Sequence, residues 1–498
     1  MSKSMSGQAN LHQREDVKST IRTMSLGTFW RVLRYPFILL SMAIIPKMMG
    51  DADYGRYAYF ISMFVILDML TDLGFLQIFG RFVPEYEAKG DQSRLAGLLH
   101  GVLVFGIMLA GLLSVALIMF HAWRPIPGMN WEWVILLCCM LLLTRIEGTL
   151  FSYLYGLNQI ARFSAKEVLR SACTLILVVA FYWRYGLSGA LWALVANEII
   201  LCLLSLWWTR DHAWQFRGRE SPGSLRPFLL FGIGFYIPGF LFGLLQRSGN
   251  VLVQQITHSS EQVAYYDIAN QYLLLTATFL GLILQTLLPA LTKLHLEKET
   301  VMMERWQRII MTYCAILAFV SFNALMWLGE LLIVTWLGEA FRPVMDNAVI
   351  IAIAIIPMLV AYAGMNYSLI DKTPGVYICG VGAGMAVMVA ACFWLIPGMG
   401  SVGASWGTVL GYTALGTVFL FRYFRMFSRI LKGFLAAVLV ALAFIPVYQW
   451  GEGWRDSILL FITTSVVYPA ILFVLRIIRW KDVLKIRDAF KQRKNQES

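Results

Sequence analysis

Long apolar runs cover almost the whole chain and limit its fold more than any other feature. They are separated by short charged or Gly/Pro breaks, and about 20 apolar residues span a bilayer as a helix. The sequence is 59% hydrophobic and only 14% charged, whereas a soluble protein carries roughly a quarter charged residues. This composition excludes a soluble multidomain enzyme and predicts an all-α polytopic membrane protein. Fourteen helices are expected, at about 24–46, 55–80, 95–121, 131–157, 166–185, 188–209, 226–248, 263–290, 307–329, 343–370, 375–396, 402–424, 432–449 and 457–478.

The distribution of positive charge predicts the orientation of these helices. The net charge is +12, with 41 Lys and Arg, and membrane proteins concentrate Lys and Arg in cytoplasmic loops. With both termini in the cytoplasm, only six Lys or Arg fall in segments on the opposite side: Lys47, Arg56, Arg124, Arg184, Arg342 and Arg455. The charge therefore indicates topology, and no nucleic-acid partner is expected.

An internal repeat organises the chain. Gly186-x-x-Gly189-Ala190-x-Trp192 returns 214 residues later as Gly400-x-x-Gly403-Ala404-x-Trp406, six predicted helices further on. Parallel repeats of this kind occur in secondary transporters. We therefore expect two six-helix lobes plus two C-terminal helices. The predicted segments are a cytoplasmic N-terminal segment (1–23), a first lobe (24–209), a cytoplasmic linker (210–225), a second lobe (226–424), two further helices (425–478) and a basic cytoplasmic tail (479–498). The tail is either an amphipathic helix on the inner leaflet or a solvated end.

Motifs for enzymatic chemistry are not evident in the sequence. The seven cysteines lie in apolar runs without a CxxC pair, and the six histidines fall at predicted helix ends or loops. The loops are short, with no ATP-binding motif and no N-terminal pattern of a cleavable signal peptide. We therefore expect no metal, no cofactor and no enzymatic activity.

Charged residues inside predicted membrane helices are the candidate functional residues, since each is costly at bilayer depth. Arginine in the first lobe suits an anion, because its planar guanidinium binds phosphate in a bidentate manner. The carboxylates would position these arginines or titrate. The candidates for substrate binding are Arg31, Arg34, Arg145 and Glu198, and those for gating or coupling are Asp68, Asp72, Glu147, Arg247 and Asp267.

A purely structural role is the alternative for these charges. Counting from the cytoplasmic helix ends puts Arg31 level with Asp72 and Arg34 level with Asp68, so these could be buried ion pairs, and Arg247 with Asp267 a third. Arg145 has no acid on its own helical face. Arg170 is expected to extend towards the inner membrane surface.

Three neighbouring motifs carry a family resemblance. Asp53–Ala58 (Asp-Tyr-Gly-Arg-Tyr-Ala), Leu70–Phe75 (Leu-Thr-Asp-Leu-Gly-Phe) and Arg81–Tyr86 (Arg-Phe-Val-Pro-Glu-Tyr) follow one another in this order. They resemble the first hairpin of bacterial Wzx-type polysaccharide flippases of the multidrug/oligosaccharidyl-lipid/polysaccharide (MOP) superfamily. The Gly-x-x-Gly-Ala turns are also similar to that family. Many members have twelve helices, and the lipid II flippase branch has fourteen.

The resemblance implies a V-shaped, two-lobe MOP/MATE-like fold in the bacterial inner membrane. It also implies the movement of undecaprenyl-diphosphate-linked oligosaccharide, such as an O-antigen or exopolysaccharide unit, from the inner to the outer leaflet by alternating access. The expected partners are this lipid, membrane lipids and polysaccharide polymerase machinery, with a coupling proton or sodium ion. A drug/cation antiporter of the same superfamily and a membrane glycosyltransferase or polymerase are the alternatives. An acidic residue is usual on the seventh helix, where this chain has Arg247-Ser-Gly-Asn.

Overall fold

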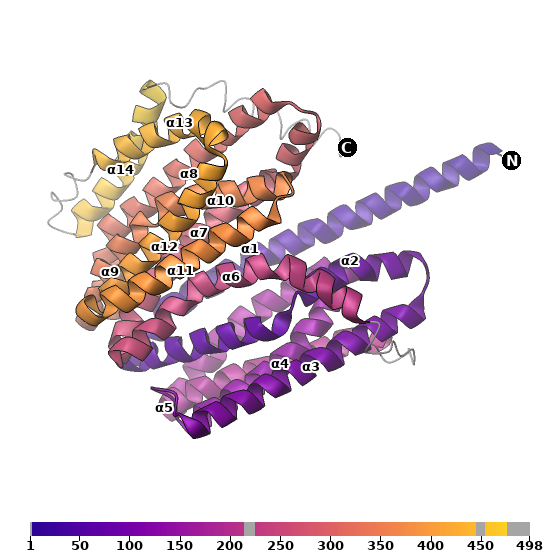
Figure 1. Cartoon of the computed structure of the whole chain (residues 1–498), viewed down its shortest axis with the longest axis horizontal. Coiled ribbons are helices and arrows are strands. Elements are labelled where there is room, and N and C mark those ends of the chain that lie inside the picture. Colours follow the sequence, from indigo (N-terminus) through magenta and orange to yellow (C-terminus); the bar gives the residue numbers. More distant parts are fainter. Residues whose placement is uncertain (1, 214–224, 445–453, 476–498) are drawn as a thin grey trace. The chain divides into compact units, whose positions relative to one another are not determined.

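The computed structural model describes residues 2–213, 225–444 and 454–475, without the side chains of residues 2–28 and 31 and of a few later stretches. These ranges form helices joined by short turns, without a strand (Figure 1). The helices are α1 (Ser2–Asp72), α2 (Phe75–Ala88), α3 (Gln92–Trp123), α4 (Trp131–Gly156), α5 (Ile160–Ala213), α6 (Arg226–Thr257), α7 (Ser260–Leu296), α8 (Thr300–Gly329), α9 (Pro343–Ile353), α10 (Ile355–Ile370), α11 (Pro374–Met399), α12 (Ser401–Arg422), α13 (Phe424–Leu442) and α14 (Trp454–Val474).

Within the described residues, each of the fourteen predicted segments corresponds largely to helix, which confirms the all-α prediction. Helix α5 contains the predicted segments 166–185 and 188–209 on either side of the non-helical Gly186, and α1 contains 24–46 and most of 55–80 on either side of the non-helical Gly50. Conversely, α9 and α10 form a single predicted segment bent by 41°. Nine helices of the described chain, or ten if this bent pair is one span, are long and apolar enough to cross a membrane.

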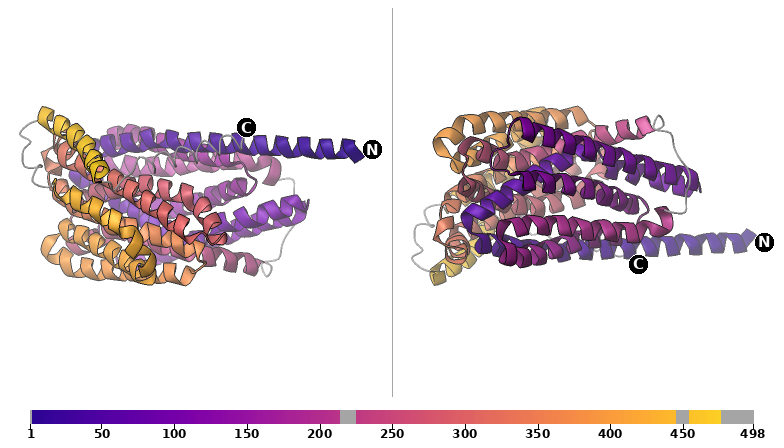
Figure 2. Two further views of the ribbon diagram at one scale, coloured as in Figure 1. Left: turned by 90° about the horizontal axis from the view of Figure 1, so that it is seen from above. Right: turned by 90° about the horizontal axis from the view of Figure 1, so that it is seen from below.

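The chain forms two compact units, Met1–Gly243 and Leu244–Ser498. The division falls inside α6, whereas the sequence suggested a linker at 210–225, most of which (214–224) lies outside the described residues. Within the first unit, α5 packs against α1 and α4, and α3 packs against α4. Within the second, α12 packs against α10 and α11, and α8 packs against α13 and α14. Figure 2 shows these helices from two further directions.

The repeated glycine motif forms the same tight hairpin in both units. Gly186 and Gly400 have φ values of 63° and 57°, a region that glycine adopts without steric cost. One turn later, a Cβ on Gly189 would meet the carbonyl oxygen of Phe181, and one on Gly403 would meet the backbone of Leu395. The motif therefore lets two antiparallel helices approach closely directly after the turn.

A second break divides the predicted helix 55–80. Leu73 and Gly74 have φ values of 46° and 82°, so α1 ends at Asp72 and α2 begins at Phe75. A Cβ on Gly74 would lie 2.8 Å from the backbone carbonyl carbon of Gly232 in α6. The corner that follows Asp72 thus requires glycine for both its backbone conformation and its contact with α6.

We predict that Gly74→Ala destabilises the protein more than Gly90→Ala. Both glycines have positive φ, but Gly90 has no atom within 4 Å of the added Cβ, so its substitution costs only the conformational preference, about 1–2 kcal/mol. Overpacking against Gly232 should add about 1–3 kcal/mol. Thermal unfolding of the purified variants in detergent measures the difference, and equal melting temperatures would contradict the predicted contact.

Candidate functional site: a network of ion pairs in the first unit

Arg145 of α4 binds two carboxylates of α1. Its Nη2 donates a short hydrogen bond to Asp68, and its Nη1 lies 3.3 Å from Oδ1 of Asp72. Asp68 and Asp72 are one helical turn apart, so both face the same neighbour, as their i,i+4 spacing predicts. The Arg145 side chain is 5% exposed and lies over the Phe75 ring, 5.9 Å from its centroid. We call Asp68, Arg145 and Asp72 the Arg145 triad.

Six further charged side chains form a continuous series of alternating sign. We call this series the charge chain, and it runs Arg34, Glu167, Lys166, Glu147, Arg170 and Glu198. Its successive nitrogen–oxygen distances are 3.1, 3.3, 2.9, 2.9 and 2.5 Å. Three cations and three anions alternate, so the charge chain is formally neutral.

Helix geometry explains how the network is assembled. Arg145 and Glu147 are two residues apart on α4 and so point to different sides, Arg145 to α1 and Glu147 to α5. Within α5, the hairpin at Gly186 returns the chain so that Glu198 meets Arg170, and the Asn197 side-chain amide donates to the Thr174 hydroxyl at 3.0 Å.

A hydroxyl connects the charge chain to the helix that carries the triad. Thr144 precedes Arg145 on α4, and its Oγ1 donates to Glu198 at 3.3 Å. The triad has one cation for two carboxylates, so together the two groups carry one formal negative charge in excess. These nine side chains therefore have no excess of positive charge.

The structure changes the pairings expected for the first-lobe arginines. Arg34 pairs with Glu167, and Asp68 pairs with Arg145, so the Arg34–Asp68 pair that the structural alternative suggested does not form. Counting along helices gives the level of a side chain but not the neighbour that it faces. Asp72 binds Arg145, and the suggested pair of Arg31 with Asp72 stays a prediction. The side chain of Arg31 lies outside the described residues.

Three residues of α5 were missed or misplaced by sequence reasoning. Lys166 and Glu167 are the first two residues of the predicted helix 166–185, whereas α5 begins at Ile160 and places both inside the helix. Arg170 does not extend to the membrane surface but bridges Glu147 and Glu198. Lys166 and Arg170 have i,i+4 spacing and so share one helical face. This spacing, together with Glu147 on the preceding helix, is the signal that could have identified them.

In the second unit the suggested pair of Arg247 and Asp267 stays a prediction, and two side-chain amides bind Asp267. Asp267 accepts hydrogen bonds from the side-chain amides of Asn250 and Gln271, both at 2.6 Å. Asp267 is 3% exposed, so these hydrogen bonds lie in the interior. Arg247 is half-buried on the turn before Asn250, and its gating role stays a prediction.

The two copies of the repeat differ in charge. The 214-residue offset that relates Gly186 to Gly400 also relates Glu198 to Tyr412 and Arg170 to Gly384. Tyr412 is fully buried, and a Cβ on Gly384 would lie 2.9 Å from the Gly411 carbonyl oxygen. The hairpin that carries an ion pair in the first unit is therefore closely packed through small residues in the second.

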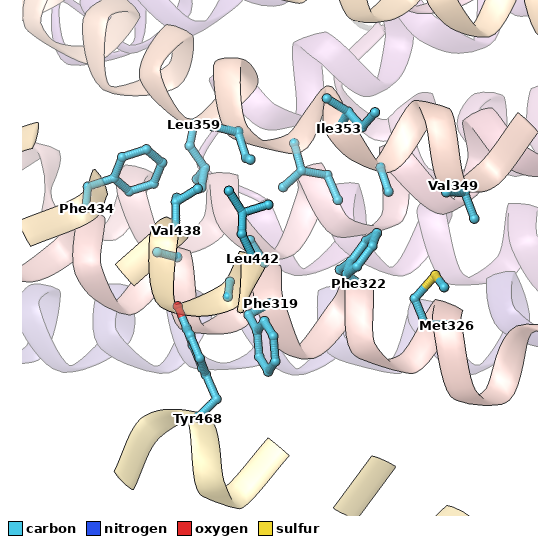
Figure 3. Close-up of a pocket in the computed structure, with 16 residues that line it drawn as sticks. Phe319, Phe322, Met326, Val349, Ile353, Leu359, Phe434, Val438, Leu442 and Tyr468 are labelled. Carbon is cyan, nitrogen blue, oxygen red and sulfur yellow. The ribbon is translucent and has the colours of Figure 1, made fainter. Parts of the chain in front are cut away.

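The second unit also contains an apolar cavity of about 610 Å³ (Figure 3). Its walls come from α8, α9, α10, α13 and α14, and the hydroxyl of Tyr468 is the single polar side-chain group among its sixteen lining residues. That hydroxyl donates to the Ala437 carbonyl at 3.0 Å. Such a cavity suits hydrocarbon and offers no charged group to an anion.

Comparisons with known proteins agree with this architecture. The lipid II flippase MurJ in its inward closed conformation matches with a TM-score of 0.64 and 14% identity, over 92% of this chain and 100% of that one. An inward-facing multidrug resistance MATE family transporter of the MOP superfamily matches with a TM-score of 0.62 and 13% identity, over 81% of this chain and 99% of that one. No curated protein matches the sequence. The family model described as "Polysaccharide biosynthesis protein" matches residues 23–295. This match covers more than half of the sequence, so the chain is a multi-pass membrane protein that belongs to the polysaccharide biosynthesis protein family.

Proposed function

We propose that this protein is a flippase that moves an undecaprenyl-diphosphate-linked oligosaccharide from the inner to the outer leaflet of the bacterial inner membrane by alternating access. The family and the MurJ-like and MATE-like fold support a transporter. The observation that carries the proposal is the network of charged side chains within the helices of the first unit, where ionisable residues mark substrate or ion pathways.

Arg34 is the cation that we assign to the diphosphate. Its side chain is 43% exposed, whereas that of Arg145 is 5% exposed and already binds two carboxylates. We therefore assign Arg145, with Asp68 and Asp72, to gating or coupling, together with Glu147. Glu198 lies at the buried end of the charge chain and would respond to the substrate through Arg170.

Reconstitution into proteoliposomes tests this proposal directly. A fluorescent oligosaccharide linked to a prenyl diphosphate is placed in both leaflets, and lectin quenching then reports how fast the inner pool appears outside. The protein should accelerate this exchange, whereas Arg34→Gln should not. Uptake of ethidium without any flipping of the lipid would instead identify a drug antiporter. A change in the mass of the oligosaccharide would identify a glycosyltransferase.

A proton or a sodium ion is our proposal for the driving force. The Arg145 triad has one excess negative charge, and Asp68 and Asp72 are 24% and 35% exposed, so a monovalent cation could neutralise it. Imposing a pH gradient or a sodium gradient separately across the proteoliposomes distinguishes the two ions. If neither gradient changes the initial rate, the coupling part of the proposal is wrong.

We predict that both termini are cytoplasmic. Reporter fusions after Trp208 and after Arg476 should report a cytoplasmic position, and one after Trp454 should report the outside. The reason is the concentration of Lys and Arg in the segments assigned to the cytoplasm. Paired alkaline phosphatase and green fluorescent protein fusions measure this, each serving as the control for the other. A cytoplasmic signal at Trp454 would contradict the fourteen-helix topology.

A further inference from the structure

The link between Arg34 and Glu167 is the accessible end of the charge chain. Side-chain exposure falls from 43% at Arg34 to 27% at Glu167, 9% at Lys166 and 1% at Glu147. Nη1 of Arg34 lies 3.1 Å from Oε2 of Glu167, while its Nε is buried without a hydrogen-bond partner. A guanidinium can donate five hydrogen bonds, so this pair leaves much of the binding capacity of Arg34 unused.

We propose that Glu167 is a resident counter-ion of Arg34 that the anionic group of the substrate displaces on binding. This inference rests on the proposed function, and it assigns a role to Glu167 and Lys166 in the same site. Glu167 occupies Arg34 when the substrate is absent, and a diphosphate takes its place through a bidentate contact. An anion must therefore bind the Arg34 guanidinium more tightly than the Glu167 carboxylate does.

Lys166 makes this exchange reversible. Removing one partner from an ion pair leaves an uncompensated charge, and the cost grows with burial. Glu167 avoids this cost, since its other carboxylate oxygen lies 3.3 Å from Nζ of Lys166. Lys166 is held in turn by Glu147 at 2.9 Å, and its Nζ lies 4.8 Å from the centroid of the Phe151 ring. The released carboxylate therefore keeps a fixed cation and can return to Arg34.

The exchange predicts selection by charge. A carboxylate competes well with another singly charged group for one guanidinium, but poorly with a diphosphate that carries more charge and more acceptor oxygens. Because the competitor is built into the protein, weakly charged lipids are excluded without any steric barrier. Specificity of this type depends on a repulsive or competing element as much as on attraction.

The test measures the binding of farnesyl diphosphate to the purified full-length protein in detergent, by isothermal titration calorimetry. Glu167→Gln removes the competitor with little change in shape, and it should lower the Kd about fivefold, which corresponds to about 1 kcal/mol for a partly exposed ion pair. Arg34→Gln should weaken binding. The double variant should bind no better than Arg34→Gln, because the gain requires Arg34.

Glu132→Gln is the matched control. Glu132 lies in the first turn of α4 and accepts a hydrogen bond from the Trp192 indole at 3.0 Å. Its substitution therefore removes the same charge at a position outside the charge chain. It should leave the Kd unchanged. Glu167→Asp shortens the side chain and should give an intermediate gain, which keeps the test valid if the Gln variant folds poorly.

Two results would overturn the inference. The first is unchanged or weaker binding in both Glu167 variants. The second is a gain that persists after Arg34→Gln, which would place the anion on another cation, such as Arg31. The proteoliposome assay separates this outcome from a failure of the proposed function. If the wild type flips the lipid but Glu167→Gln binds farnesyl diphosphate no more tightly, only the counter-ion role is wrong. If Glu167→Gln binds more tightly but the wild type does not flip the lipid, only the proposed substrate is wrong.

Discussion

Arg170→Gln should strongly destabilise the protein. Arg170 is the shared partner of Glu147 and Glu198, whose side chains are 1% and 3% exposed. After the substitution, Glu147 keeps its ion pair with Lys166 at 2.9 Å, whereas Glu198 keeps the hydrogen bond from the Thr144 hydroxyl at 3.3 Å. Leaving a buried charge without its partner costs about 3–5 kcal/mol.

Thermal unfolding in detergent and the amount of inserted protein measure this effect. A cost of this size corresponds to a melting temperature lowered by about 10 °C for a unit of this length. Arg162→Gln is the control on the same helix, because Arg162 is exposed and hydrogen bonds only locally, to Gln159 at 2.8 Å. The melting temperature of Arg170→Lys should lie between those of Arg170→Gln and Arg162→Gln, since an ammonium keeps the charge but lacks the planar, bidentate geometry of a guanidinium. A melting temperature equal to that of Arg162→Gln would refute the bridging role.

The fold was predictable because it depends on properties that are local in sequence. The length of an apolar run and the position of charged breaks define a membrane helix, and this was enough for the fourteen segments. The break at Leu73–Gly74 was not predictable in this way. Leu73 lies inside the predicted helix 55–80 and adopts a positive φ of 46° that its residue type does not indicate.

The charged site was predictable only in part. The spacing of Asp68 and Asp72 indicated a common face, and both residues do bind the same arginine. The identity of that arginine depends on which helix packs against that face, and this is a tertiary property. Arg34 shows the same limit, because its partner Glu167 comes from α5 and not from the next predicted helix, 55–80.

The boundary of α5 explains the remaining error. A helix start placed at residue 166 makes Lys166 and Glu167 terminal and leaves Arg170 free to reach water. The observed start at Ile160 puts all three inside the helix, where their charges need partners. An error of six residues in one boundary therefore concealed half of the charge chain.

The second large effect is expected at the Arg145 triad. Arg145→Gln removes the cation between Asp68 and Asp72, and the two like charges would then repel each other without compensation. Breaking a buried pair in this way costs about 3–5 kcal/mol. The melting temperature and polymer export in a strain that depends on this protein should both fall. Arg81→Gln is the control, because Arg81 is 62% exposed and its nearest carboxylate oxygen, on Glu85, is 3.7 Å away.

The compensated variant, Arg145→Gln with Asp68→Asn and Asp72→Asn, separates structure from function. Replacing all members of a buried ionic group is often neutral for stability, so the melting temperature should recover. Export should not recover if the excess carboxylate of the triad takes up the coupling ion, because the neutral triad has no charge to titrate. Recovery of both readouts would show that the triad only joins α1 to α4, and the coupling role would then have to be sought elsewhere. Recovery of stability alone is the expected result, because the two carboxylates of the triad are partly exposed and share one arginine.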